Sequence, residues 1–239
     1  MSCTIWTPLA VSSEARSWSA SAWRMVEAQH LASTMKLVDD ATQQDVLEML
    51  LEGSKPPLPS SASRLHYLLA TPFRYHPLRS GSRFRGPTDP GVFYGGECAR
   101  TTCAELGYWR WKFLQDAVGL ERLEPTAHTA FRVKLATSMV DLRQPPFAAN
   151  LSAWRHPADY SATQAFARIA RDAKVGAILY SSVRDPEPSW CVAVLDPAAF
   201  AAPRPEPRTQ TWWLAVQQDG VVWRRDSERL EFSATPWLP

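Results

Sequence analysis

The proline-rich segment KPPLP at residues 55–59 divides the sequence into two parts with different periodicities. Proline fixes φ and lacks a backbone N–H, so this segment ends a helix and favours an extended linker. Between residues 14 and 52, apolar residues recur at spacings near three to four, which is typical of a helix. After the linker, apolar runs are short and are separated by Gly, Pro and Asp. The sequence therefore predicts a helical N-terminal appendage over residues 1–60 and a second domain over residues 61–239.

The second part alternates segments of strand length with segments of helix length. Residues 129–135 alternate apolar and polar side chains, as a half-buried strand does. Further strands are predicted over 92–94, 176–182, 190–195, 211–216 and 220–224, and helices over 99–114 and 161–173. This order predicts an α+β fold with short-stranded sheets and flanking helices.

Length, composition and charge restrict the class of protein. With 239 residues, 45% of them hydrophobic, the chain can bury a substantial core. No window approaches eighteen consecutive apolar residues, so we expect no membrane-spanning helix. A basic segment followed by an apolar run is missing from the N-terminus, so we expect a cytoplasmic protein without a signal peptide. The formal net charge of +2 does not favour nucleic acid as a direct partner.

Cysteine and histidine are scattered along the chain. The four cysteines include no C-x-x-C pair and form no cluster with histidine at zinc-ligand spacing. The five histidines likewise offer no Ser-His-Asp arrangement. We therefore expect no metal site.

Arginines gather before a short aromatic strand, at Arg74, Arg83 and Arg85. A planar guanidinium can donate two parallel hydrogen bonds to an oxyanion, which suits phosphate binding. Arg83 stands in a Gly-Ser-Arg-Phe sequence, where Gly81 lets the backbone approach a ligand closely. The alternative role for these loop arginines is in surface ion pairs.

Three other side chains carry possible chemistry. Glu105 is the acidic residue of the helix predicted over 99–114, and a carboxylate suits reactions in which positive charge develops on a sugar; its alternative is an exposed, solvated glutamate. Tyr94 ends a strand, where its ring either stacks on a ligand or packs in the core. Ser182 follows another strand, where its hydroxyl either orients a ligand oxygen or caps local backbone. With the arginines, these residues suggest a site for a phosphorylated, glycosidically linked ligand such as a dinucleotide.

The order of these residues resembles the RES family, which is named for its arginine, glutamate and serine. The matching segments are Phe73-Arg74, Gly81-Ser82-Arg83-Phe84, Gly91-Val92-Phe93-Tyr94-Gly95-Gly96, Ala104-Glu105 and Ile178-Leu179-Tyr180-Ser181-Ser182-Val183-Arg184. The resemblance covers about residues 65–200. It implies a RES domain with a fold like that of the diphtheria-toxin type of ADP-ribosyltransferases.

The same resemblance implies a role for each residue. Arg74 and Arg83 would bind the pyrophosphate of NAD, the substrate. Tyr94 would stack on the nicotinamide or the adjoining ribose. Glu105 would stabilise the oxocarbenium-like state by which nicotinamide leaves the ribose, and Ser182 would orient a phosphate or ribose oxygen. Glu105, Arg83 and Ser182 are thus the candidate catalytic residues.

The family consists of toxins of bacterial toxin–antitoxin pairs, which inhibit growth. The resemblance therefore implies a cognate helix-turn-helix antitoxin as partner. Three acceptors of ADP-ribose stay open: a host protein, inorganic phosphate or water, which would make the enzyme an ADP-ribosyltransferase, an NAD phosphorylase or an NAD glycohydrolase. A non-catalytic nucleotide-binding module is the alternative.

Overall fold

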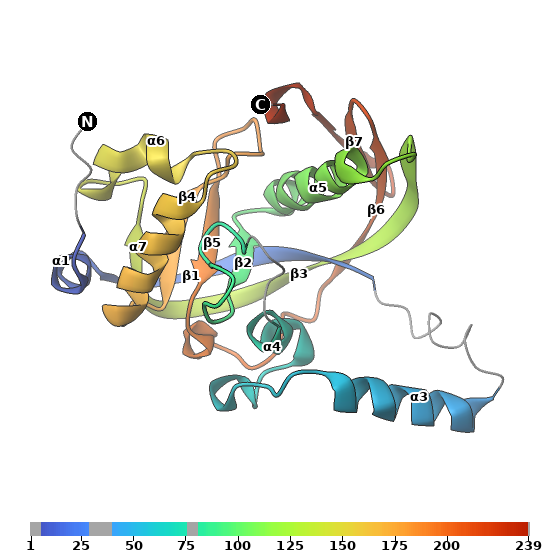
Figure 1. The fold of residues 1–239 in the computed structure, drawn as a ribbon, viewed down its shortest axis with the longest axis horizontal. Coiled ribbons are helices and arrows are strands. Elements are labelled where there is room, and N and C mark those ends of the chain that lie inside the picture. Colours follow the sequence, from blue (N-terminus) through green and yellow to red (C-terminus); the bar gives the residue numbers. More distant parts are fainter. Residues whose placement is uncertain (1–5, 29–39, 76–80, 239) are drawn as a thin grey trace.

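The protein folds into an eight-stranded sheet flanked by helices, as a computed structural model of residues 6–28, 40–75 and 81–238 shows (Figure 1). The helices are α1 (Pro8–Ser13), α3 (Ala41–Ser54), α4 (Tyr67–Arg74), α5 (Ala99–Asp116), α6 (Leu151–Trp154) and α7 (Ser161–Asp172). The strands are β1 (Arg16–Glu27), β2 (Phe93–Gly96), β3 (Arg122–Asp141), β4 (Ala177–Ser181), β5 (Trp190–Val194), β6 (Gln210–Gln217), β7 (Gly220–Arg225) and β8 (Glu228–Ser233). The mixed fold with a sheet and flanking helices is as expected from the sequence.

The helix predicted over residues 14–52 is wrong in its first part, because residues 16–27 form strand β1. β1 pairs antiparallel with β3 along its whole length, from Arg16 opposite Met139 to Glu27 opposite His128. Its alanines favour a helix whereas its tryptophans and valine favour a strand, so pairing with a distant strand decides the conformation. The second part of the prediction is confirmed by α3, and residues 29–39 lie outside the described residues. Residues 16–27 therefore belong to the sheet and not to a helical appendage.

Strand β3 joins two parts of the sheet. The strand order is β1-β2-β5-β4-β3-β6-β7-β8, and the additional pairing of β1 with β3 closes the first five strands into a ring. β4 pairs with the end of β3 in parallel, whereas β6 pairs antiparallel with its beginning. β3 thus extends well beyond the strand predicted over 129–135. In Figure 1 it runs as a long curved strand beneath α5 and α7.

Three groups of buried side chains form the core. α7 packs on the ring through Phe166, and α4 packs on it through Phe73, which meets Phe200. α5 packs on β6 and β7 in a third group, which includes Trp111 and Trp223. Successive side chains of a strand point to opposite faces, so β4 and β5 each contribute to two of these groups. The candidate site lies where α5 approaches β1 and β2.

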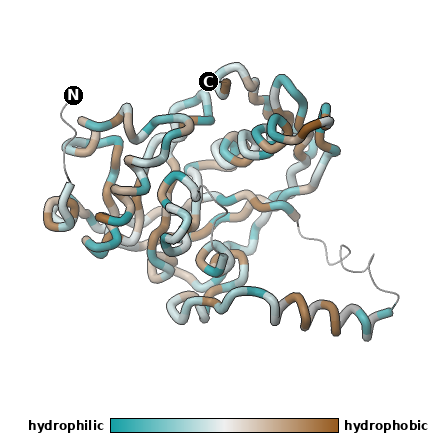
Figure 2. Tube along the Cα trace, viewed as in Figure 1, coloured by the Kyte–Doolittle hydropathy of each residue, from teal (hydrophilic) through white to brown (hydrophobic). Residues whose placement is uncertain are grey.

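Helix α3 carries a run of hydrophobic residues (Figure 2), and several of their side chains are exposed. Met49 and Leu50 are 66% and 62% exposed, and Val46 is 47% exposed. None of the helices in the described part of the chain is both long and apolar enough to span a membrane.

Candidate active site

A pocket of about 270 Å³ lies between β1, β2, α5 and the loops that follow α4, α6 and β4. It is lined by Arg24, Met25, Ser82, Arg83, Tyr94, Gly95, Gly96, Thr102, Glu105, Leu106, Trp109, Tyr160, Tyr180, Arg184 and Cys191. The structure thus brings together three residues that the sequence indicated, Arg83, Tyr94 and Glu105. A fourth, Ser182, is hydrogen-bonded to Glu105.

The Ser182 hydroxyl donates a 2.6 Å hydrogen bond to Oε1 of Glu105. Oγ of Ser182 in turn accepts hydrogen bonds from the backbone N–H groups of Asp185 at 3.1 Å and Arg184 at 3.3 Å. Because these amides donate to the lone pairs of the hydroxyl oxygen, the hydroxyl proton is free to point at the Glu105 carboxylate. The Cys191 thiol lies 3.7 Å from the same Oε1, and burial raises the thiol pKa, so the group stays protonated. Glu105 is therefore oriented by two neutral donors.

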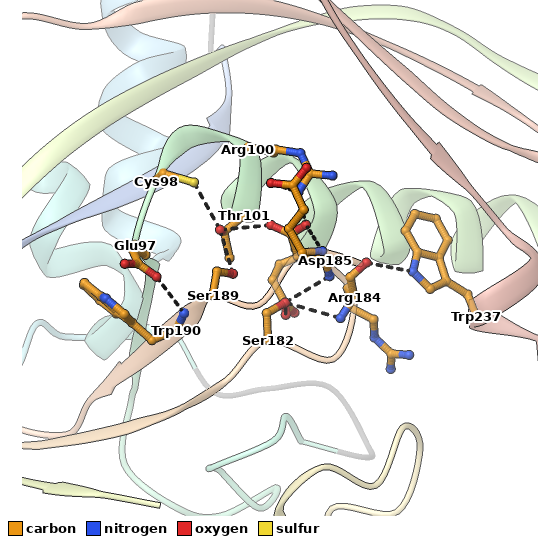
Figure 3. Close-up of polar contacts among 12 residues, drawn as sticks. Glu97, Cys98, Arg100, Thr101, Ser182, Arg184, Asp185, Ser189, Trp190 and Trp237 are labelled. Atoms are coloured by element: carbon orange, nitrogen blue, oxygen red, sulfur yellow. Dashed lines mark hydrogen bonds and ion pairs between the residues drawn. The ribbon is translucent and has the colours of Figure 1, made fainter. Parts of the chain in front are cut away.

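The turn that carries Ser182 is tied to the beginning of α5 (Figure 3). The buried carboxylate of Asp185 accepts a hydrogen bond from Arg100 and lies 3.1 Å from the hydroxyl oxygen of Thr101. That hydroxyl also lies 2.9 Å from Ser189 Oγ. These contacts join α5, which carries Glu105, to the loop between β4 and β5.

Arg83 is presented by a tight turn. Gly81 has φ of +72°, and a Cβ there would lie 2.1 Å from the backbone oxygen of Arg85, so only glycine fits. Nη1 of Arg83 donates to the backbone oxygens of Trp154 and His156, each at 3.0 Å. Its guanidinium carbon lies 4.6 Å from the centre of the Tyr160 ring. Arg83 therefore both lines the pocket and holds the segment before α7 in place.

Tyr94, which lies on β2, holds the same turn through its hydroxyl group. Its hydroxyl oxygen lies 2.7 Å from Ser82 Oγ and accepts a 2.9 Å hydrogen bond from the backbone N–H of Phe84. Burial raises the pKa of Tyr94, so the hydroxyl stays protonated at neutral pH. The Tyr94 ring lines the pocket, while its hydroxyl is used within the protein.

Two further arginines, Arg24 and Arg184, line the pocket, and neither was among the site residues expected from the sequence. Arg24 of β1 donates from Nη1 to the backbone oxygen of Tyr94 at 2.8 Å, and burial lowers its pKa to about 10, so it remains charged at neutral pH. Arg184 donates to the backbone oxygen of Pro157, and its guanidinium carbon lies 3.4 Å from the centre of the Tyr108 ring. The signal for Arg24 was an isolated charge among apolar neighbours, which the helical prediction obscured.

Arg74 does not join the pocket, contrary to the expectation that it and Arg83 bind one pyrophosphate together. It ends α4, where Nε donates to the backbone oxygen of Pro56 at 2.6 Å, and it lines a different cavity together with Arg85. The alternation along β2 explains this separation. Phe93 packs in the same group as α4, whereas the next residue, Tyr94, lines the pocket.

Potential metal ligands do not gather in the part of the chain that the structure describes. No group of three or more His, Cys, Asp or Glu side chains is placed to hold an ion within residues 6–28, 40–75 and 81–238. The expectation of a metal-free site stays a prediction.

Comparison with known proteins identifies the family. No curated protein matches the sequence. Among solved structures, the crystal structure of the M. tuberculosis MbcT–MbcA toxin–antitoxin complex is similar at a TM-score of 0.47 and 13% identity, over 96% of this chain and 93% of that chain. The family model of the RES domain matches residues 58–217, about two thirds of the 239 residues. The chain therefore belongs to the RES domain family.

Proposed function

We propose that this protein is the toxin of a RES-type toxin–antitoxin pair and that it cleaves NAD at the bond between nicotinamide and ribose. One observation carries the proposal: Ser182 holds the Glu105 carboxylate at 2.6 Å in a pocket that Arg24, Arg83 and Arg184 also line. Guanidinium groups suit the pyrophosphate of a dinucleotide, and a carboxylate suits a sugar on which positive charge develops.

The proposed reaction needs little covalent chemistry from the protein. The bond from ribose C1′ to the nicotinamide ring nitrogen breaks, and its electron pair leaves with nicotinamide, which becomes neutral. Positive charge then spreads over C1′ and the ring oxygen, and the Glu105 carboxylate stabilises it electrostatically. An acceptor then adds to C1′: water or a protonated side chain loses a proton to solvent, whereas phosphate adds through an unprotonated oxygen. Water, inorganic phosphate or a host-protein side chain can serve as this acceptor.

The size of the pocket restricts how NAD enters it. Ligand pockets commonly enclose about 300–1,000 Å³, and this pocket holds about 270 Å³. We therefore propose that the nicotinamide and its ribose enter the pocket while the adenosine end extends toward its mouth. Trp109 lines the pocket and is 46% exposed, which suits contact with that outer part.

An enzyme that consumes NAD harms its own cell, so the proposal includes an antitoxin, a small helix-turn-helix protein. We propose that this partner acts in the cytoplasm and places a carboxylate against the pocket arginines, where it mimics the anionic ligand. Co-expression should then restore growth, and NAD should compete with the partner for binding. Unchanged access of NAD to the complex would contradict this mode of inhibition.

Release of nicotinamide from NAD tests the activity. Purified protein should release nicotinamide above the buffer rate, and the Glu105→Gln protein should not. Parallel reactions with inorganic phosphate and with cell extract, followed by mass spectrometry of labelled products, identify the acceptor. Binding of NAD without release under all three conditions would instead support the non-catalytic nucleotide-binding module.

A further inference from the structure

A second cavity, of about 570 Å³, is lined by residues at the end of α4, in the loop before β2 and at the end of α7. Arg83 lines the candidate active site, whereas Arg85, the next residue but one, lines this cavity, and the two cavities share no lining residue. Among the described residues, four basic side chains line it, Arg74, Arg85, Arg171 and Lys174, against one acidic side chain, Asp196. We infer that this cavity binds a small phosphate-bearing anion, at a site separate from the one proposed for NAD.

Arg171 of α7 provides the strongest argument. Its Nη2 donates to the backbone oxygens of Pro90 at 3.1 Å and Gly91 at 3.3 Å. Its Nε and Nη1 are buried and have no hydrogen-bond partner among the described residues. Buried charges in proteins are normally paired and hydrogen-bonded. Here, burial lowers the pKa of Arg171, and the nearby charge of Asp89 offsets this effect only in part.

Arg85 adds a second charge that only neutral groups contact. It is 7% exposed, and it donates to the backbone oxygens of Asp89 at 3.0 Å and Tyr75 at 2.6 Å. The carboxylate of Asp89 is used elsewhere, since it accepts from Arg168 at 3.0 Å and from the Gly86 amide at 2.7 Å. The positive charge of Arg85 therefore adds to that of Arg171.

The backbone that orients Arg171 is closely packed. A Cβ on Gly91 would lie 2.3 Å from Cα of Phe73 and 2.5 Å from the backbone oxygen of Pro72, so only glycine lets this loop touch α4. The carbonyls of Pro90 and Gly91 are thus held between α4 and α7. The guanidinium is positioned before any ligand binds, which reduces the entropic cost of binding.

The charge and shape of the cavity favour a phosphate ester. Several cations around one cavity favour a multiply charged anion over a monocarboxylate, and the guanidinium fork matches phosphate oxygens. Lys174 is exposed at the rim, where its flexible ammonium can reach an anion directly. The rest of the lining is largely apolar, with Phe73, Val175, Leu195 and several prolines. The cavity volume exceeds that of phosphate alone. A phosphorylated small molecule would therefore place its phosphate against the basic side chains and its remainder against the apolar lining.

Calorimetric titration of the full chain with inorganic pyrophosphate tests the site. We expect Arg171→Gln and Lys174→Gln each to weaken one binding event about tenfold or more, the effect of losing one charge-assisted contact. The matched control Arg155→Gln removes one exposed arginine outside both cavities, and it should leave the affinity unchanged. Circular dichroism establishes that each variant is folded. Lys174 is exposed, so its variant keeps the test valid if Arg171→Gln unfolds.

An Arg83→Gln protein separates this site from the candidate active site, where pyrophosphate also has arginines to bind. The binding event that Arg171→Gln weakens should persist in Arg83→Gln, and acetate should not compete for it. The inference is overturned if folded Arg171→Gln and Lys174→Gln bind pyrophosphate as the unchanged protein does, or if Arg155→Gln weakens binding equally. Failure of NAD cleavage would not affect it, because this measurement does not depend on turnover.

Discussion

The indole N–H of Trp237 donates a 3.2 Å hydrogen bond to the backbone oxygen of Arg184. Trp237 lies in the C-terminal turn Thr235–Trp237, beyond the residues that match the RES domain, whereas Arg184 lines the candidate active site. The Trp237 ring also packs edge-on against Tyr108, over which the Arg184 guanidinium lies. The C-terminal turn therefore supports one wall of the pocket.

Replacing Trp237 with Phe keeps an aromatic ring and removes the donor. We expect the free energy of unfolding to fall by about 0.5–1.5 kcal/mol, the usual contribution of one hydrogen bond, and NAD turnover to fall because the Arg184 turn loses its anchor. Urea unfolding and nicotinamide release measure the two effects. Trp213→Phe is the control, because Trp213 is 53% exposed and does not line the pocket. Equal effects of both changes would contradict the supporting role.

Replacing Glu105 with Gln keeps its size and removes its negative charge. If the carboxylate stabilises an oxocarbenium-like state, turnover should fall far more than NAD binding, because the lost interaction strengthens in the transition state. One such electrostatic contact commonly contributes about 3–4 kcal/mol, or roughly two to three orders of magnitude in rate. Turnover and NAD affinity measured on the same protein test this. Near-normal turnover of the folded variant would contradict the catalytic role of Glu105.

Replacing Asp185 with Asn tests the link between α5 and the Ser182 turn. The asparagine amide oxygen can still accept a hydrogen bond from Thr101, but the negative charge that pairs with Arg100 is lost. We therefore expect the free energy of unfolding to fall by about 1.5–3 kcal/mol. NAD turnover should fall as well. Glu187 offers a matched control, since it also contacts Arg100, at 3.3 Å, but its side chain is 71% exposed. Glu187→Gln should cost about 0–1 kcal/mol. A cost for Asp185→Asn no larger than this would refute the link.

His128 predicts how stability depends on pH. It is fully buried in β3 against Trp223, and burial lowers its pKa from the ordinary value of 6.5. Below pH 6.5, His128 of the unfolded chain binds a proton, whereas the buried His128 of the folded protein does not. The contribution of His128 to the free energy of unfolding is therefore fully present above pH 6.5 and is lost as pH falls toward the lowered pKa. The slope from this residue approaches about 1.4 kcal/mol per pH unit. Urea unfolding between neutral and acidic pH should show it, and His128→Gln should flatten the dependence.

Local patterns predicted the second part of the chain well. The helices over 99–114 and 161–173 and the strands over 176–182 and 190–195 are confirmed with boundaries shifted by a few residues at most. Their periodicity lies within a single segment, and glycine or proline ends it. The family resemblance selected Glu105 and Ser182 but did not indicate that they touch, which only the structure shows.

The part that failed depends on contacts between distant segments. Trp18 and Trp23 have a spacing that a helix or a strand can accommodate, and only the pairing with β3 makes this segment a strand. The same error hid Arg24, because a helix would not have brought it beside Tyr94. Arg74 was grouped with Arg83 by proximity in sequence, which does not predict the cavity that a side chain enters.

The pairing of β1 with β3 sets a lower limit on the fragment of this protein that can be expressed in working form. A polypeptide trimmed to residues 58–217 would retain Glu105 but would lack β1, so the edge of β3 that pairs with it would be bare. Such an edge is a template for aggregation. We expect the smallest useful fragment to extend from α1, whose Val11 is fully buried, to Trp237, since the shorter piece loses β1, β7, β8 and a wall of the pocket.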